Sequence, residues 1–388
     1  MGEKSFITPA VLRWARESAR ITVEQAAARA GVAVQKINEW EEGVDRPTVR
    51  QAKILAEAYK RPLALLMLPA PPRDFMPLQD FRRKNAVPLT TGTIFIIREL
   101  QEKQAWTHDW YEEEGQEPLP FVGRFSMRDS PAVVAADLLK ELDIHPPYYA
   151  HPMKEWVAKA EAKGIFISRT SFISSHLKLN SDEFQGFAIA DALAPFIFIN
   201  SEDWDASQLF TLVHELIHIW IAQSGISNEI GPESARDEQM DPVERFCNQA
   251  AAAALMPEGW MKNLPVSVFA SADEVYRQAR QCGVSSFALL VRARSLDIIT
   301  ETKYGRLKKE ADQAFLAYQL KEEKKKTALK GRESGPSPYR LRANRNGLQF
   351  CRLVLDAFRG GFIQPTQASN LLNTPINHFP KLEAFIYP

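Results

Sequence analysis

Apolar residues in the first seventy positions recur at the three- and four-residue intervals of amphipathic helices. Thr8 and Pro9 predict the start of a first helix, because proline fits the first helical position. Thr22 and Gln25 have capping-box spacing ahead of an alanine-rich second helix. Gly31 follows and can adopt the left-handed conformation that turns the chain into the next helix.

A third and a fourth helix complete this N-terminal pattern. Ile37 and Trp40 are expected to face inward from the third helix, which should end near Gly43. Pro47 and Thr48 open the fourth. The order helix, turn, helix is typical of a DNA-binding motif.

The centre of the chain combines helical and strand-like patterns. Residues 93–110 and 131–142 alternate apolar and charged positions at helical intervals. Three short runs rich in β-forming residues predict strands: 164–168, 187–190 and 196–199. They precede a nearly all-apolar helix around residues 210–220, so a small sheet should lie beside that helix. The predicted fold class is mainly α with a small β-sheet, that is, α+β.

Beyond residue 280 the pattern is again helical. Residues 284–291 predict a short turn and helix. Lysine, glutamate and proline between residues 321 and 338 predict an exposed, mobile connector. Residues 347–358 are amphipathic, and residues 366–385 are expected to form a small helical hairpin. That hairpin is either a second helix-turn-helix or structural support.

Composition fits a multi-domain protein that stays inside the cell. A chain of 388 residues exceeds a typical single core, and 45% hydrophobic residues are enough for two or three packed units. The 48 basic and 48 acidic residues give zero formal net charge, so any nucleic-acid-binding surface must be local. The three cysteines lack disulfide or metal spacing, and neither a signal core nor a bilayer-length apolar run is present. We therefore expect a cytoplasmic protein without a membrane partner.

The run His214-Glu-Leu-Ile-His218 carries the strongest chemical signal. Residues four apart on a helix lie about one turn apart and about 40° around the axis, so both imidazoles can bind one ion. Glu215 lies about 100° further round, where it can reach a water on that ion instead of binding the ion itself. The spacing predicts a catalytic zinc site with Glu215 as general base.

A third ligand is expected on a second helix, which carries Glu244 and is stopped by Pro257. His, His and Glu form one of the standard catalytic zinc sets, with a fourth position left open. Asn248, one turn beyond Glu244, is placed to bond the outer nitrogen of a ligating histidine. Three rival carboxylates in the loop-like stretch before this helix rank lower: Asp237, Glu238 and Asp241.

These residues resemble the ImmA/IrrE family of bacterial zinc metallopeptidases. The resemblance rests on residues 210–218, on Glu244-x-x-Cys-Asn248 and Ala-Leu-Met-Pro257, and upstream on Gly186-Phe187 and residues 195–200. It covers roughly residues 160 to 300. It implies a zincin-like domain in which His214, His218 and Glu244 bind Zn²⁺ while Glu215 takes a proton from water.

Three features of this region stay open at the level of sequence. Cys247 stands where the family usually has alanine; packing is the favoured role and a fourth metal contact the alternative. The candidates for stabilising an oxyanion are His151, His176 and Tyr304. We also hypothesise that an edge of the sheet takes an extended substrate peptide as an added strand.

The N-terminal region resembles the lambda-repressor-like, or Xre, helix-turn-helix family. The resemblance rests on Gly31-Val32, Ile37, Trp40-Glu41, Gly43 and Pro47. It implies that the third helix enters the major groove, where Gln35, Lys36 and Asn38 face the bases. Three acidic residues place negative charge near that surface: Glu39, Glu41 and Glu42. Five arginines are expected to compensate at the rim: Arg13, Arg16, Arg20, Arg46 and Arg50.

Four regions are expected: an Xre-type domain (1–68), a linker and helical connecting region (69–160), a zinc peptidase domain (161–300), and a basic linker with a helical extension (301–388). The preferred hypothesis is a bacterial DNA-binding regulator whose zinc-dependent endopeptidase hydrolyses a repressor- or antitoxin-type protein. The setting of stress, prophage or toxin–antitoxin control comes from the resemblance alone. A cognate toxin and a second copy of the chain are further candidate partners.

Two other hypotheses compete with this one. In the first, a non-enzymatic transcription regulator or antitoxin uses the zinc fold as a sensor or docking platform. In the second, the peptidase is retained and the N-terminal unit is a substrate-docking arm that binds no DNA.

Overall fold

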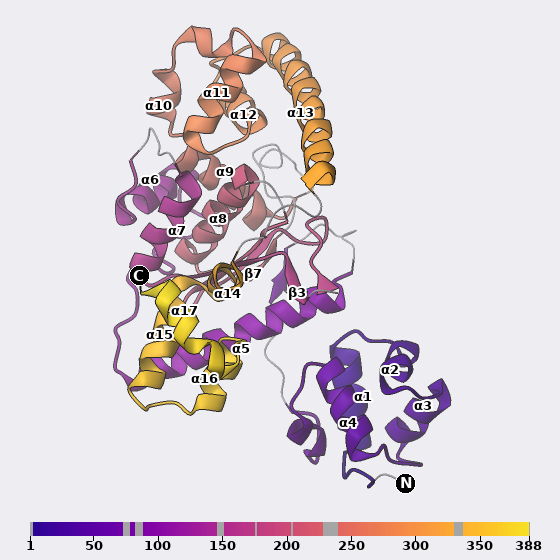
Figure 1. Cartoon of the computed structure of the whole chain (residues 1–388). Coiled ribbons are helices and arrows are strands. Elements are labelled where there is room, and N and C mark those ends of the chain that lie inside the picture. The colour runs from indigo at the N-terminus through magenta and orange to yellow at the C-terminus, as the bar shows by residue number, and fades with distance from the viewer. Residues whose placement is uncertain are drawn as a thin grey trace. The chain divides into compact units, whose positions relative to one another are not determined.

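The computed structural model in Figure 1 describes residues 3–72, 78–81, 88–145, 151–174, 177–202, 205–227, 240–329 and 337–387. It confirms a mainly α protein with a small β-sheet. The contacts divide the chain into two compact units, each described by itself. Unit 1 comprises Met1–Pro77, Val87–Glu102 and Phe172–Leu179, and unit 2 comprises Leu78–Ala86, Lys103–Ser171 and Asn180–Pro388. The four regions expected from the sequence stay a prediction.

Short helices form the centre of unit 1. They are α1 (Pro9–Ser18), α2 (Val23–Ala30), α3 (Val34–Glu42), α4 (Val49–Ala58) and the 3-10 helix η1 (Leu63–Met67). Complete capping boxes begin two of them, Thr22 with Gln25 at α2 and Thr48 with Gln51 at α4. Gly31 ends α2 in the left-handed conformation, with φ of 67°. The expected first helix, second helix and turn are confirmed.

A buried ion pair joins α1 to α3. The Arg16 guanidinium donates from Nε and Nη2 to the two Glu41 carboxylate oxygens at 2.7 and 2.8 Å, and the two side chains are 11% and 3% exposed. The expectation that Arg16 is a cation at the rim and that Glu41 repels DNA is therefore wrong. Each charge neutralises the other inside the unit, because burial without a partner would cost far more than exposure.

Two later segments complete unit 1. The first part of the helix α5 (Thr91–Glu113), as far as Glu102, belongs to unit 1. Within this part, the Arg98 guanidinium donates to the carbonyl oxygens of Ser18 and Tyr59 at 3.0 and 3.4 Å. A separate two-stranded antiparallel sheet pairs β3 (Phe172–Ser174) with β4 (Leu177–Lys178). The prediction of a helix over residues 93–110 is confirmed.

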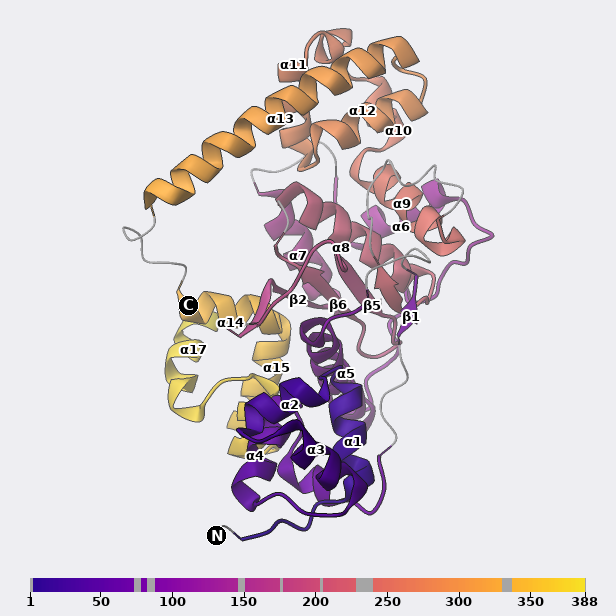
Figure 2. The same cartoon turned by 90° about the vertical axis from the view of Figure 1, so that its right-hand side faces the viewer.

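A five-stranded sheet lies in unit 2, and Figure 2 labels β2, β6, β5 and β1 in it. The strands lie in the order β1 (Gln79–Asp80), β7 (Gly225–Ser227), β5 (Gly186–Ile189), β6 (Phe196–Asn200) and β2 (Phe166–Thr170). The central strand β5 is antiparallel to both neighbours, and the two outer pairs are parallel. The three predicted strands are confirmed as β2, β5 and β6, whereas β1 and β7 are additions.

Four helices lie beside the sheet. They are α6 (Pro131–Glu141), α7 (Pro152–Ala162), α8 (Asp205–Trp220) and α9 (Pro242–Leu255). Helix α8 packs on β5 and β6 and contacts α6, α7 and α9 (Figure 2). Its residues 208–220 are all buried, which agrees with the apolar character of its sequence on nearly every side. Asp241 caps α9 by accepting a hydrogen bond from the Val243 N–H at 2.8 Å.

The next helices form one cluster of unit 2. They are α10 (Glu258–Lys262), η3 (Val266–Phe269), α11 (Ala272–Cys282), α12 (Ser286–Ser295) and α13 (Glu301–Leu329), of which α11, α12 and α13 contact one another. The segment from residue 321 that was expected to be a connector begins as part of a helix, because α13 continues to Leu329. Lysine, glutamate and alanine are good helix formers, so a charged run at a helix end is also compatible with a helix. Residues 330–336 lie outside the described part.

The last helices cover the β2 edge of the sheet. They are α14 (Pro338–Asn346), α15 (Leu348–Arg359), α16 (Pro365–Leu371), η4 (Ile376–His378) and α17 (Phe379–Ile386). Both α14 and α15 contact β2, and the Ser168 hydroxyl on β2 donates to the Arg345 carbonyl oxygen. Structural support, one of the two roles expected for this extension, accounts for these contacts. Among the described helices, none combines the length and apolar character needed to cross a bilayer.

Candidate metal centre

Two helices bring the predicted ligands together in the interior of unit 2. His214 and His218 lie one turn apart on α8, and Glu244 lies in the first turn of α9. The two Nε2 atoms are 3.1 Å apart, and the Glu244 carboxylate oxygens lie 3.1 Å from His218 Nε2 and 3.3 Å from His214 Nε2. The three side chains are at most 1% exposed. Their donor atoms therefore converge on one point.

The chemistry of these donors fits zinc. Ligands about 2.0 Å from a tetrahedral ion lie roughly 3.3 Å from one another, which is close to the separations in this cluster. His214 Nδ1 is engaged by Asn248 and so carries the ring proton, which leaves a lone pair on Nε2. That lone pair faces a carboxylate and a second imidazole nitrogen, so electron-rich atoms meet in a dry interior. A divalent cation would satisfy them together.

Asn248 holds the outer side of His214. Its Oδ1 accepts a hydrogen bond from His214 Nδ1 at 3.0 Å, and its Nδ2 donates to Met240 Sδ at 3.5 Å. Asn248 is fully buried one turn beyond Glu244 on α9. The amide therefore fixes both the tautomer and the plane of the His214 ring, which is the role that its spacing predicts.

His218 is held by different groups. The Phe81 ring stacks on the His218 imidazole, with ring centroids 5.5 Å apart and planes 23° apart. Ser227, at the end of β7, donates from its hydroxyl to Glu244 Oε1 at 3.1 Å and lies 3.5 Å from His218 Nε2. Within the described residues His218 Nδ1 has no hydrogen-bond partner. An apolar ring and one hydroxyl thus position this half of the cluster.

Glu215 stands beside the cluster without joining it. Both carboxylate oxygens are buried and have no hydrogen bond of normal geometry with the described residues. Burial raises the pKa of Glu215 well above its usual value, the charge of Glu244 raises it further, and the nearby Ser227 hydroxyl lowers it by a smaller amount. Gly186 on β5 faces this carboxylate, because a Cβ atom at Gly186 would lie 3.0 Å from Glu215 Oε1 and 2.9 Å from the Phe198 carbonyl oxygen. A carboxylate without a partner has capacity for a proton or a polar ligand.

The electrostatics of the cluster favour metal-binding protonation states. Burial lowers the pKa of His214, which keeps the imidazole neutral. Burial alone would raise the pKa of Glu244, but the interactions of its carboxylate with the two histidines outweigh that effect and lower the pKa. A neutral imidazole and an ionised carboxylate are the forms that bind a divalent cation.

Of the rival residues, only some lie in the described part of the chain. Asp241 caps α9, and Asp237 and Glu238 lie outside the described residues. Cys247 is fully buried, and its Sγ and a ring nitrogen of each histidine all lie within 4.8 Å of one another. The Glu244 carboxylate lies closer to both nitrogens than that limit, so we regard Glu244 as the third donor and Cys247 as a packing residue.

The proposed oxyanion stabilisers stay predictions. His151 precedes α7 at an exposed position, and Tyr304 on α13 packs against the Arg294 guanidinium, which lies 4.1 Å from the ring centroid. His176 lies outside the described residues.

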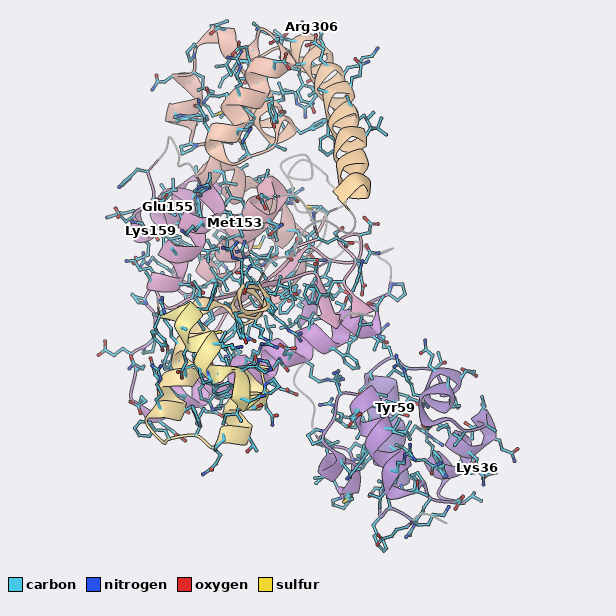
Figure 3. The ribbon with its side chains drawn as sticks, viewed as in Figure 1. Lys36, Tyr59, Met153, Glu155, Lys159 and Arg306 are labelled. Carbon is cyan, nitrogen blue, oxygen red and sulfur yellow. The ribbon has the colours of Figure 1, made fainter. Side chains whose placement is uncertain are left out.

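In unit 1 the residues expected to bind DNA share the outer side of α3. Gln35, Lys36 and Asn38 are exposed. Figure 3 shows Lys36 pointing outward from α3, and Tyr59 belongs to the core of the unit. Lys36 Nζ is paired with Glu39 at 2.6 Å and with Asp45 at 3.4 Å, so much of the negative charge next to α3 is locally balanced.

Comparison with known families agrees with both parts of this description. Residues 160–294 match the IrrE N-terminal-like domain of the M78 peptidases, and residues 12–66 match a helix-turn-helix domain. The chain joins these two domains. The M78 family is a group of zinc-dependent peptidases, so the IrrE-like domain is of metallopeptidase type. A search of curated proteins found no match.

Several residues around the IrrE-like metal centre were not singled out as site residues in the sequence. Phe81 contacts His218, and Ser227 contacts Glu244. Met240 contacts Asn248, while Gly186 leaves room beside Glu215 and Gly225 leaves room for the Phe81 ring. Only Gly186 carried a signal, because it belongs to the segment that resembles the family. The others come from short strands and loops whose role depends on long-range pairing.

Proposed function

We propose that this protein is a DNA-binding regulator whose IrrE-like domain is a zinc-dependent endopeptidase. The observation that carries the proposal is the convergence of His214, His218 and Glu244 within 3.1 to 3.3 Å of one another, beside the buried carboxylate of Glu215, which has no hydrogen bond of normal geometry with the described residues. Three ligands leave one position of a tetrahedral ion open, as catalytic zinc sites require.

Each residue has a distinct task in this proposal. A bound zinc ion would polarise the scissile carbonyl and lower the pKa of a water molecule. Glu215 accepts a proton from the attacking water at its carboxylate and passes it to the leaving amine. Its buried oxygens are available for this exchange because no other group of the described chain binds them with normal geometry. Asn248 keeps the His214 ring in its binding orientation throughout.

The substrate that we propose is a regulatory protein of the repressor or antitoxin type, acted on in stress, prophage or toxin–antitoxin control inside the cell. Gln35, Lys36 and Asn38 would read bases in the major groove, because amide and ammonium groups match the base edges exposed there. A homodimer would match two half-sites, and a cognate toxin is a further proposed partner. The family resemblance and the exposed face of α3 support these assignments.

The decisive experiment separates metal binding from proteolysis. Glu215→Gln should retain zinc and abolish cleavage, whereas Glu244→Ala should lose zinc as well, because Glu244 is one of the three proposed ligands and Glu215 is not. Cys247→Ala is the matched control on α9 and should keep both. Zinc content is measured on the purified chains, and new protein N-termini are compared by proteomics between cells that produce each variant. Cleavage that persists in Glu215→Gln, or after zinc is chelated, would refute the mechanism.

DNA binding has a test of its own. Footprinting of the promoter beside the gene should show protection by the wild-type chain and by Glu215→Gln, and loss of protection when Gln35 and Lys36 are both replaced by alanine. If no DNA is protected, the helix-turn-helix domain is a docking arm. If repression requires Gln35 and Lys36 while no N-terminus depends on Glu215, the protein is a non-enzymatic regulator.

A further inference from the structure

A segment of the chain occupies the edge of the sheet beside the metal centre. Gln79 and Asp80 form the strand β1 and pair in parallel with Gly225 and Ile226 of β7. The next residue, Phe81, continues the pairing by donating its N–H to the Ile226 carbonyl oxygen at 3.1 Å. The segment Leu78–Phe81 therefore lies on β7 as a short added strand.

The strand β7 belongs to the wall of the metal centre. Its last residue, Ser227, donates a hydrogen bond to the ligand Glu244. At the opposite edge of the sheet, α14 and α15 contact β2. The side of the sheet that carries β7 is thus the one next to the proposed ligands. An extended peptide paired with β7 in the place of β1 would run past the proposed ligands.

Phe81 anchors the added strand in a site shaped for an aromatic ring. Gln79 and Asp80 are exposed, but Phe81 is only 3% exposed. One side of its ring stacks on His218, and a Cβ atom added at Gly225 would overlap the ring. Gly225 therefore provides the space that the ring fills. The strand has one buried side chain and few backbone bonds, so another peptide with the same features could replace it.

We propose that Leu78–Phe81 is an internal occupant of the peptide-binding strand position. The position would take an extended peptide with an aromatic side chain in the place of Phe81, and a substrate must displace the segment before it can bind. This inference rests on the proposed peptidase function, because it assigns the same site a substrate class and a block. Backbone pairing supplies affinity in this type of recognition, and the pocket between His218 and Gly225 supplies specificity.

The block should be strong enough to measure. Burial of a phenylalanine side chain shifts an equilibrium by about tenfold or more, and a site that is open in only a fraction of molecules shows an affinity reduced by that fraction. Removal of the Phe81 ring should therefore strengthen the binding of an external peptide by at least about tenfold.

The test uses the zinc-loaded full chain carrying Glu215→Gln and a fluorescein-labelled peptide that reproduces residues 76–86. Fluorescence anisotropy should show at least tenfold tighter binding to Phe81→Ala than to the parent chain. Phe6→Ala, at a position 77% exposed, is the matched control and should bind like the parent. The same peptide with its phenylalanine replaced by alanine should bind neither chain. Equal binding by the parent and Phe81→Ala would overturn the inference.

A second measurement does not depend on the folding of Phe81→Ala. Gln79→Cys carries a fluorophore at an exposed position of β1, and the cysteines of the native chain are all buried. Saturation with the unlabelled peptide should change the emission of this fluorophore in the otherwise unaltered chain, and the alanine-containing peptide should not. An unchanged emission would overturn the inference. Because neither readout requires hydrolysis, absence of proteolysis would refute the proposed function while leaving the displacement measurable.

Discussion

Replacement of Asn248 by alanine tests how the metal centre is organised. The substitution removes the hydrogen bond that Asn248 Oδ1 accepts from His214 Nδ1, 3.0 Å long, and takes that partner from a nitrogen in a fully buried site. Loss of such a partner typically lowers metal affinity by about 10- to 100-fold, which equals about 1.4 to 2.7 kcal/mol. An unsatisfied buried donor costs about 1–3 kcal/mol whether or not zinc is bound, so the substitution should also lower the folding stability of the zinc-free chain by about that amount.

Zinc affinity is measured by competition with a chromophoric chelator at neutral pH. Gln249→Ala is the matched control, because Gln249 is an amide on the same helix at an exposed position. Asn248→Asp retains an acceptor for the His214 N–H and should recover most of the lost affinity. Thermal unfolding without zinc separates a general loss of stability from a loss of metal binding. If Asn248→Ala and Gln249→Ala bind zinc equally well, Asn248 does not orient His214.

Two further predictions concern stability. The hydrogen bond and charge of Asp191, 2.9 Å from His108, raise the pKa of His108 above 6.5, so the folded state holds that proton more tightly than the unfolded state. The stabilisation by this pair should be complete below about pH 6.5 and should be lost as the pH rises through the raised pKa. Urea unfolding should therefore show a difference in the free energy of unfolding between wild type and His108→Gln that becomes smaller as the pH rises. A difference that does not change with pH would contradict this prediction. Glu41→Ala should destabilise unit 1 by about 3–5 kcal/mol, because it leaves Arg16 buried without its carboxylate, whereas exposed Glu42→Ala should change stability by less than about 0.5 kcal/mol. Similar unfolding of the two glutamate variants in denaturant would show that the buried pair contributes little.

Local sequence patterns predicted the structure correctly where it depends on a single helix or turn. The four-residue spacing of His214 and His218 placed both imidazoles on one face, and the structure has them there. Thr22 and Gly31 marked the beginning and end of α2 because capping and left-handed turns depend on neighbouring residues alone. Local spacing could not place Glu244 beside the histidines, because Glu244 lies on a second helix. The contact between α8 and α9 brings its carboxylate to them.

The features that the sequence did not predict share a physical cause, because each depends on residues distant in the chain or on solvent exposure. Arg16 and Glu41 looked exposed because charged side chains usually are, and only the packing of α1 on α3 makes their burial favourable. The charged end of α13 looked like a connector because charge does not distinguish a solvated helix from a coil. The strands β1 and β7 are too short to show an alternating pattern, so their existence depends on the partner strand.

The two histidines of the candidate metal centre are held by groups of different origin. His214 is fixed by Asn248, which lies on the same helix as Glu244, so its orientation is built into the packing of α8 and α9. His218 is fixed by Phe81, which comes from a segment more than a hundred residues earlier and lies on the sheet edge through a few backbone bonds. If that segment yields to a substrate, the substrate's own aromatic ring takes over the contact with His218. Substrate binding and zinc binding would then be linked by the same stacking contact, and each would change the affinity of the other by an equal factor.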